Sequence, residues 1–310
     1  MSARIAAPKP NLFLVGAPKA GTTSIDQLLR EHPDVFLSPI KEPCHFCTDV
    51  ADQLSQSVQR KRKFDVAAYL DASERKLEGL AWVDSPGHYA RLFDAADAQP
   101  VIGECSTFYL SSKVAARAIH DYNPDARIVA LLRDPLQRIR SHYEMDRVHG
   151  LTARSLTSLI EEELALGDDA HWGNCFYYLG ASRYAPQLAR FRQYFPHDKV
   201  LVLSFESLLA DTEATLRQLY AFLGIDALPE LLALPSANRG RAARFPGFNR
   251  ALHASGLKPL VSGLLKSGLS SRLEQRMKSA YYRRGVHVVS DEEMQRIGRL
   301  LRDEGLMAAA

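Results

Sequence analysis

The stretch NLFLVGAPKAGTTSIDQLLREHP, residues 11–33, constrains the fold most strongly. It combines an apolar run, a glycine-bounded turn and an amphipathic helix, which is the layout of a phosphate-binding P-loop. Gly16 and Gly21 keep the glycine spacing of a nucleoside-triphosphatase loop, but Thr22 stands where that loop has its lysine. The lysine comes earlier, at Lys19. Three interpretations follow: a degenerate ATPase loop, a plain strand-to-helix turn, or a loop for a different phosphorylated ligand.

Strands and helices alternate through the first two thirds of the chain. Apolar runs predict strands at 11–16, 101–104, 127–132 and 199–205, and helical patterns lie at 22–31, 111–121, 136–148, 183–194 and 212–223. A last helix is predicted after the capping box SDEE, which begins at Ser290. We therefore expect an α/β, P-loop-like three-layer fold with a central parallel sheet flanked by helices and a mostly helical C-terminal part. Ligands of such sheets bind at the carboxyl ends of the strands.

Composition narrows the class of protein. The 310 residues are 46% hydrophobic and 24% charged with a net charge of +3, which is typical of a globular protein and far from the basic stripe of a nucleic-acid binder. The first ten residues lack the apolar core of a signal peptide, and no run predicts a membrane span. Four cysteines do not make a disulfide framework, so we expect a cytoplasmic protein. Cys44 and Cys47 form one C-x-x-C without a second ligand pair, which favours small buried side chains over a metal or redox site.

Two further stretches are rich in arginine. In LLRDPLQRIRSHYEM, residues 131–145, Arg133 stands where a predicted strand stops, and Ser141 lies two turns along the following helix. In SANRGRAAR, residues 236–244, three arginines surround Gly240. Arginine offers a planar fork that suits phosphate oxygens, although either stretch alone could be an ordinary basic segment.

Together the three stretches predict one ligand with two anionic groups. Lys19 and Arg133 follow two strands of a parallel sheet, so such a ligand would lie across adjacent strand ends, and the third stretch would close over it. ATP would also need a carboxylate for magnesium and the usual loop lysine. Asp134 is an acidic residue at a strand end, which keeps the ATPase interpretation open.

Several segments resemble one known family. APKAGTTS resembles the 5′-phosphosulfate loop of the sulfotransferases that use 3′-phosphoadenosine 5′-phosphosulfate (PAPS), and RDPLQRIRS resembles their 3′-phosphate motif. SPIKEPCHF is similar to their K-E-x-x-x-F element, and IGECSTFYL to a G-E-x-S-x-x-Y-L stretch. The resemblance covers residues 11 to 244 and is strongest to bacterial members and to the domains that modify heparan sulfate.

The resemblance implies the donor site. Arg133 and Ser141 match the residues that grip the 3′-phosphate. By a looser match, the late basic loop at 238–241 corresponds to a loop that covers the cofactor in that family. The 5′-phosphosulfate would be held by Lys19, Ala20, Gly21, Thr22, Thr23 and Ser24, and the late loop consists of Asn238, Arg239, Gly240 and Arg241.

The resemblance also implies catalytic residues. Glu104 falls on a glutamate that acts as general base in the heparan-type enzymes, and Lys41 on a lysine of the same cleft; Lys19 would lie near the bridging oxygen. Glu104 could instead be a structural carboxylate paired with a lysine. His45 is a competing base, because cytosolic small-molecule sulfotransferases use histidine. Cys105 stands where the heparan-type enzymes usually have lysine, which argues against an acidic glycan acceptor.

These observations predict a PAPS-dependent sulfotransferase without a metal. It would move the sulfuryl group to a hydroxyl, in preference to an amine, of a small-molecule, glycan or lipid acceptor by in-line transfer. We expect one domain over residues 1–310, with a core at 11–244 and a helical part at 245–310 that covers the acceptor side. The alternatives are a kinase or ATPase with a degenerate P-loop, and a non-catalytic nucleotide-binding protein. Neither the acceptor nor the oligomeric state follows from the sequence.

Overall fold

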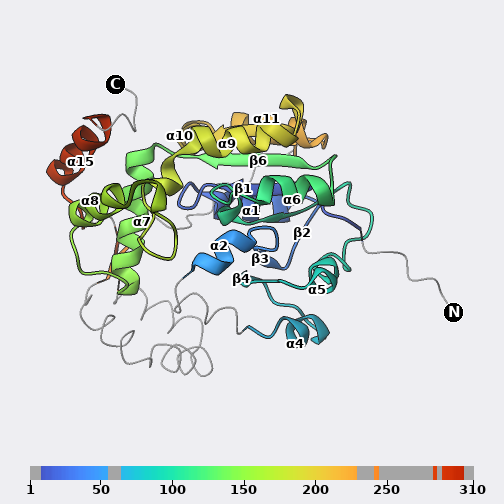
Figure 1. Ribbon diagram of the computed structural model, residues 1–310. Coiled ribbons are helices and arrows are strands. Elements are labelled where there is room, and N and C mark those ends of the chain that lie inside the picture. The colour runs from blue at the N-terminus through green and yellow to red at the C-terminus, as the bar shows by residue number, and fades with distance from the viewer. Residues whose placement is uncertain (1–7, 55–63, 229–240, 244–281, 285–287, 304–310) are drawn as a thin grey trace. The chain divides into compact units, whose positions relative to one another are not determined.

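The computed structural model describes residues 8–54, 64–228, 241–243, 282–284 and 288–303, and Figure 1 draws the rest of the chain as a grey trace. The chain divides into two compact units. The first, which we call the sheet unit, contains residues 1–134 and 170–235, and the second contains residues 135–169 and 236–310.

A five-stranded parallel sheet forms the centre of the sheet unit. Its strand order is β2-β5-β1-β6-β7, so β1 lies between β5 and β6. All five residues of β1 are buried, as expected for an apolar strand covered on both faces. Register pairs Leu12 of β1 with Gly103 on one side and Arg127 on the other. The strands are β1 (Leu12–Gly16), β2 (Val35–Leu37), β5 (Val101–Cys105), β6 (Arg127–Leu132) and β7 (Val200–Ser204).

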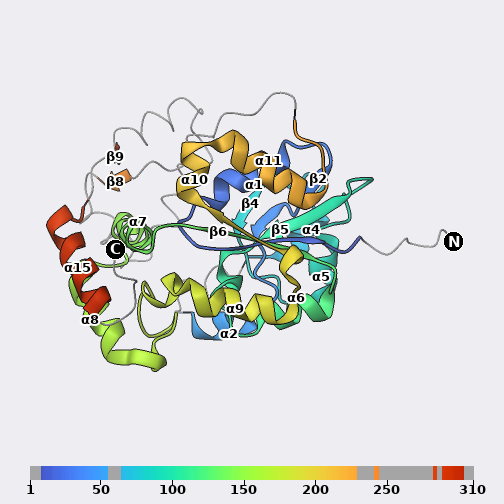
Figure 2. The same cartoon turned by 90° about the horizontal axis from the view of Figure 1, so that it is seen from above.

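Helices cover both faces of this sheet. Figure 2 shows α1 (Thr22–Arg30), α10 (Phe205–Ala210) and α11 (Thr212–Leu223) on one face, and α6 (Ala115–Tyr122) and α9 (Tyr184–Tyr194) on the other. The α/β fold and the four strands predicted from apolar runs are therefore confirmed. The other helices of the unit are α2 (Thr48–Gln53), α4 (Val66–Asp71), α5 (Pro86–Arg91) and the 3-10 turns η2 (Thr107–Tyr109), η4 (Gly180–Ser182) and η5 (His197–Lys199).

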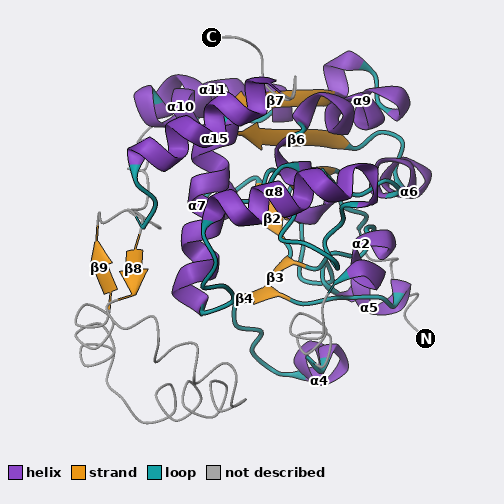
Figure 3. Cartoon of the chain, turned by 60° about the vertical axis from the view of Figure 1, so that its left-hand side comes forward, coloured by secondary structure: helices purple, strands orange, loops and turns teal. Residues whose placement is uncertain are grey.

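The sequence patterns did not predict a second, two-stranded parallel sheet. It pairs β3 (Ile40–Glu42) with β4 (Glu78–Leu80) and is visible as two short arrows in Figure 3. The pairing continues past β4, because Ala81 N donates to Glu42 O at 3.1 Å and Val83 N to Pro43 O at 3.0 Å. Three-residue strands are too short to show a reliable alternation, which explains why they were missed.

The second unit contains α7 (Pro135–His149), α8 (Leu156–Leu166), the turn η3 (Gly167–Asp169) and α15 (Asp291–Asp303), together with an antiparallel pair of β8 (Arg241–Ala243) and β9 (Tyr282–Arg284). The predicted helix start at Ser290 is confirmed, since Glu293 N donates to Ser290 Oγ at 3.1 Å, which is the serine half of the capping box. The Glu293 carboxylate instead accepts from Thr157 N and Oγ1, each at 3.1 Å. The glycine-containing and helical segments expected within 245–281 lie outside the described residues. Among the helices of the described ranges, none has the length and apolar character needed to cross a membrane.

Gly21 is required by the conformation of the loop after β1. Its φ of 91° is left-handed, and it caps the amino terminus of α1. A Cβ atom at this position would lie 2.6 Å from a ring carbon of Phe205. Both the backbone conformation and the space therefore select glycine.

We expect Gly21→Ala to lower the free energy of unfolding by about 1–3 kcal/mol, because alanine adds strain and a steric overlap. Urea unfolding followed by circular dichroism measures the change. Gly79→Ala is the matched control, since a Cβ there meets nothing within 4 Å. Equal stabilities of the two variants would contradict the argument.

Candidate active site

The loop after β1 presents the amino terminus of α1 at the carboxyl edge of the sheet. Ala17 N donates to Leu131 O at 2.6 Å, which ties the loop to β6, and Ser24 N donates to Gly21 O at 2.9 Å. The first amides of a helix have no intrahelical acceptor, and together with the helix dipole they form an anion site. The predicted donor residues lie around this turn, with Ala20, Thr22 and Ser24 buried and Lys19, Gly21 and Thr23 half-buried.

Arg133 lies against this loop. Its Nη1 donates to the carbonyl of Lys19 at 3.2 Å, and its guanidinium carbon lies 4.8 Å from the ring centroid of Phe205. Tyr184 OH donates to the Arg133 carbonyl at 3.0 Å. The structure thus brings together two of the predicted phosphate-binding elements, as the neighbouring positions of β1 and β6 require.

The remaining predicted donor contacts lie elsewhere in the chain. Ser141 lies on α7 of the second unit, and Arg241 begins β8 of that unit. Asn238, Arg239 and Gly240 fall outside the described residues. The roles of these five residues at the nucleotide stay predictions.

Glu104 on β5 is fully enclosed by hydroxyl donors. Tyr89 OH and Tyr109 OH donate to Oε1 at 2.9 and 2.7 Å, and Ser106 Oγ donates to Oε2 at 2.6 Å. Ser106 Oγ also accepts from the amide of Cys44, so its own proton is directed to the carboxylate. The Glu104 side chain pairs with three hydroxyls and is only 1% exposed.

Burial decides the charge state of Glu104. It raises the pKa of this carboxyl to about 7, while the hydrogen bonds from Ser106, Tyr109 and Tyr89 lower it and nearby Glu42 raises it further. The removal of a carboxylate from water therefore outweighs three favourable hydrogen bonds.

Lys41 and Glu42 form a half-buried ion pair on β3. Lys41 Nζ lies 2.9 Å from Glu42 Oε1, and Thr107 Oγ1 donates to Glu42 Oε2 at 3.1 Å. Burial disfavours the Lys41 ammonium, but Cys105 and Glu42 raise its pKa above the ordinary value, so it is charged at neutral pH. Glu42 was not singled out from the sequence. Its position beside the predicted Lys41 was the available signal.

His45 is held in one tautomer by a backbone carbonyl. Its Nδ1 lies 2.6 Å from Val83 O, and because a carbonyl can only accept, Nδ1 carries the proton and Nε2 has the lone pair. The ring stacks on Tyr89 with centroids 4.2 Å apart and planes at 10°. Burial lowers the pKa of His45, although the Val83 contact raises it, so the ring is neutral at pH 7.

A buried ion pair joins α1 to the segment that leads to β3. Asp26 is 1% exposed and accepts from Arg30 Nε at 2.9 Å and Nη2 at 3.1 Å. Arg30 also donates to the carbonyls of Leu37 at 3.1 Å and Ser38 at 2.7 Å. The i, i+4 spacing of Asp26 and Arg30 places both on one face of α1.

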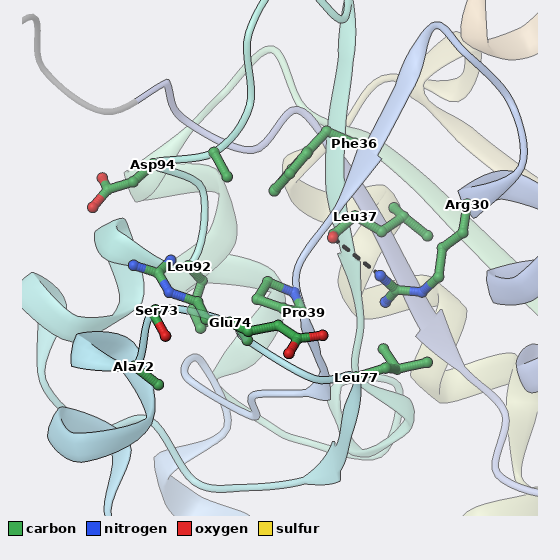
Figure 4. Close-up of a pocket in the computed structure, with 12 residues that line it drawn as sticks. Arg30, Phe36, Leu37, Pro39, Ala72, Ser73, Glu74, Leu77, Leu92 and Asp94 are labelled. Atoms are coloured by element: carbon green, nitrogen blue, oxygen red, sulfur yellow. Dashed lines mark hydrogen bonds between the residues drawn. The ribbon is translucent and has the colours of Figure 1, made fainter.

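Figure 4 shows a pocket of about 720 Å³ beside this ion pair, with the Arg30 to Leu37 hydrogen bond dashed. It is lined by apolar side chains such as Phe36 and Leu77 and by charged ones such as Glu74 and Asp94. None of the predicted site residues lines it.

The cysteines near the site are uncharged thiols. Burial raises the pKa of Cys105 to about 12, although Lys41 lowers it. Cys44 and Cys47 are buried, with Cys47 Sγ 3.4 Å from the Cys44 carbonyl. All four cysteines are free. Within the described ranges, no cluster of three His, Cys, Asp or Glu side chains could hold a metal ion.

Comparison with known proteins identifies the class. The model of the sulfotransferase family matches residues 10–230. The chain belongs to the sulfotransferase family, which confirms the family predicted from the sequence. In fold, it is similar to the crystal structure of a sulfotransferase from Alicyclobacillus acidocaldarius, with 26% identity, a TM-score of 0.60, and coverage of 85% of this chain and 98% of that one.

Two curated relatives show how far the similarity extends. Carbohydrate sulfotransferase 15 of Mus musculus is 26% identical over 259 residues, which cover 71% of this chain and 45% of that protein. Heparan sulfate glucosamine 3-O-sulfotransferase 3A1 of Mus musculus is 24% identical over 217 residues, 70% of this chain and 46% of that protein. The chain therefore spans about half the length of these relatives.

The pKa of Glu104 predicts how stability depends on pH. The pKa of Glu104 in the native state, about 7, exceeds the ordinary value of 4.5. Between these two pH values the native state therefore keeps a proton that the unfolded chain has lost. The stabilisation is complete below the unfolded pKa and is lost as the pH rises through 7. Between pH 5 and 8 the wild type should lose about 2–3 kcal/mol relative to Glu104→Gln, which does not titrate. Urea unfolding of both proteins at the two pH values measures this, and parallel pH dependences would refute it.

Proposed function

We propose that this chain transfers the sulfuryl group of PAPS to a hydroxyl group of an acceptor. The observation that carries the proposal is the hydrogen bond from Arg133 to the Lys19 backbone carbonyl, which joins two loops that each carry a cationic residue at neighbouring strand ends. Two anion-binding elements at one sheet edge suit a nucleotide that has a phosphosulfate on one side and a 3′-phosphate on the other. Ser141 and the loop 238–241 complete the donor site in this proposal.

The sheet unit supplies what sulfuryl transfer needs. The sulfur–oxygen bond to the acceptor forms as the bond to the donor phosphate breaks, and charge develops on the departing phosphate. Lys19 and the first amides of α1 stabilise that charge, and each preorganised donor of this kind contributes ~3–4 kcal/mol. The acceptor proton passes to a base, and the products are the sulfate ester and the 3′,5′-bisphosphate nucleotide.

The geometry favours Glu42 over Glu104 as the base that accepts this proton. Both oxygens of Glu104 already accept from buried hydroxyls, and its side chain is 1% exposed. Glu42 also accepts at both oxygens, from Lys41 Nζ and Thr107 Oγ1, but its side chain is 19% exposed, so exposure is what distinguishes it from Glu104. In this proposal Glu104 positions η2 through Ser106 and Tyr109. His45, with a lone pair on Nε2, is the alternative base.

Substitution of the two carboxylates separates these roles. We expect Glu42→Gln to lower kcat by ~10²–10⁴-fold, the usual effect of losing a general base, while the dissociation constant of the bisphosphate nucleotide stays unchanged. Glu104→Gln is the matched control and should lower kcat by much less. The reverse order would return the base to Glu104, and full activity of both variants would point to His45.

The nucleotide preference tests the function against its rivals. A ligand at 100 times its dissociation constant adds ~2.7 kcal/mol to the free energy of unfolding. We expect 3′,5′-bisphosphoadenosine to raise the thermal midpoint more than ATP with magnesium does. The opposite order would support a kinase or ATPase. Bisphosphate binding without turnover on any acceptor would support a non-catalytic binding protein.

The domain plan and the location of the protein belong to the same proposal. We propose that residues 245–310 cover the acceptor side of a single functional domain. Deleting them should then abolish turnover and spare bisphosphate binding. The four free cysteines suit a reducing compartment such as the cytoplasm.

A further inference from the structure

Four aromatic side chains form a continuous row in the sheet unit. The ring centroids of Trp82 and Phe108 lie 5.9 Å apart at 30°, those of Phe108 and Trp172 5.1 Å apart at 81°, and those of Trp172 and Tyr177 5.2 Å apart at 56°. These are the distances and angles of attractive ring pairs. We call these four residues the aromatic row.

Chain neighbours of the first two rings of the row bond to the proposed base, Glu42. Trp82 lies between Ala81 and Val83, whose amides bond to the carbonyls of Glu42 and Pro43. Phe108 directly follows Thr107, whose hydroxyl donates to Glu42 Oε2 at 3.1 Å. The first two residues of the row are therefore direct chain neighbours of residues that bond to Glu42, one to its backbone carbonyl and one to its carboxylate.

The far end of the row is held just as firmly. Trp172 Nε1 donates to Ser111 Oγ at 3.1 Å. A Cβ atom at Gly173 would overlap the Gln53 carbonyl, so this loop is in direct contact with the end of α2. Tyr177 has a left-handed φ of 54°, an unfavourable conformation that is concentrated at functional sites in proteins.

The aromatic row has partly exposed residues and one hydrogen-bond donor without an acceptor among the described residues. Phe108, Trp172 and Tyr177 are only half-buried, so part of each ring is accessible. Trp82 is 4% exposed, and its indole N–H has no acceptor among the residues that the structure describes. A buried donor without an acceptor is unfavourable, and an oxygen of a bound hydroxyl compound would satisfy it.

We propose that the aromatic row is the acceptor wall and that it selects a hydroxyl carried on an uncharged ring, either a phenol or a neutral pyranoside. Aromatic faces bind flat apolar ring faces. The row has no formal charge, Glu42 would repel an anionic acceptor, and the nearby cation of Lys41 is already paired with Glu42. Cys105 is a neutral thiol. This inference rests on the proposed function.

Tryptophan fluorescence tests the binding without any turnover. The chain has two tryptophans, Trp82 and Trp172, and both belong to the row. We expect 4-methylphenol or methyl β-glucopyranoside to change the emission of the protein, measured both without and with 3′,5′-bisphosphoadenosine, and the two compounds distinguish the phenol from the sugar. A heparin-derived tetrasaccharide should not change it. No response to either neutral ring, or preferential response to the tetrasaccharide, overturns the proposal.

Substitutions link the row to the reaction. Trp172→Leu removes a ring face and should raise the acceptor KM about tenfold while leaving the dissociation constant of the bisphosphate unchanged. Trp172→Phe retains a ring and should restore most of the affinity. The matched control is Phe176→Leu in the same loop, whose ring stacks on Tyr178 at 5.6 Å outside the row. An equal effect of the control, or no effect of Trp172→Leu in a folded protein, refutes the assignment.

The binding and turnover results test the aromatic row and the proposed sulfotransferase function separately. If neutral rings change the fluorescence but the bisphosphate nucleotide does not bind, the proposed function fails and the aromatic row remains a ring-binding site. If the protein binds the nucleotide and sulfates only anionic glycans, the proposed function stands and the assignment of the aromatic row fails.

Discussion

The parallel pairing of β1 with β5 on one side and β6 on the other is the constraint on which the site depends. Parallel strands end at the same edge, so this order gathers the loop after β1, the carboxylate of β5 and Arg133 after β6. Gly103 permits the close β1–β5 contact, because a Cβ there would lie 2.6 Å from the Leu12 carbonyl. The hydrogen bond of Arg133 to Lys19 then connects two loops that are distant in sequence.

The enclosed Glu104 shows how a charged group can be part of a core. Tyr89 comes from α5, Ser106 and Tyr109 come from the segment that forms η2, and each directs a hydroxyl at the carboxylate. These bonds hold η2 in place, because moving Ser106 would leave Oε2 without its donor and moving Tyr109 would leave Oε1 with one donor in place of two. A carboxylate used in this way organises its surroundings, which is a different task from exchanging protons with a bound acceptor.

Much of the fold was predictable, because strong local signals agree with the tertiary structure. The strand 127–132 and the helix 212–223 have the predicted bounds, and the strand-to-helix turn lies between Gly16 and Gly21 as predicted. The base was harder to assign from sequence. Glu42 and Glu104 are both carboxylates at strand ends, and only burial and partners distinguish them. The aromatic row joins residues 82, 108, 172 and 177, and no spacing rule relates positions so far apart.

The Asp26–Arg30 pair has a consequence for how the site can open. Arg30 ends α1, whose first turn belongs to the proposed donor site, and its guanidinium donates to the carbonyls of Leu37 and Ser38, just before the strand of Lys41 and Glu42. The proposed donor loop and the proposed base are thus connected through opposite ends of α1. Rotating or sliding that helix would break both hydrogen bonds from Arg30 to the Leu37 and Ser38 carbonyls. In the proposed function, the acceptor therefore enters by movement of other segments around this connected pair, so the rates of entry and of chemistry can change independently.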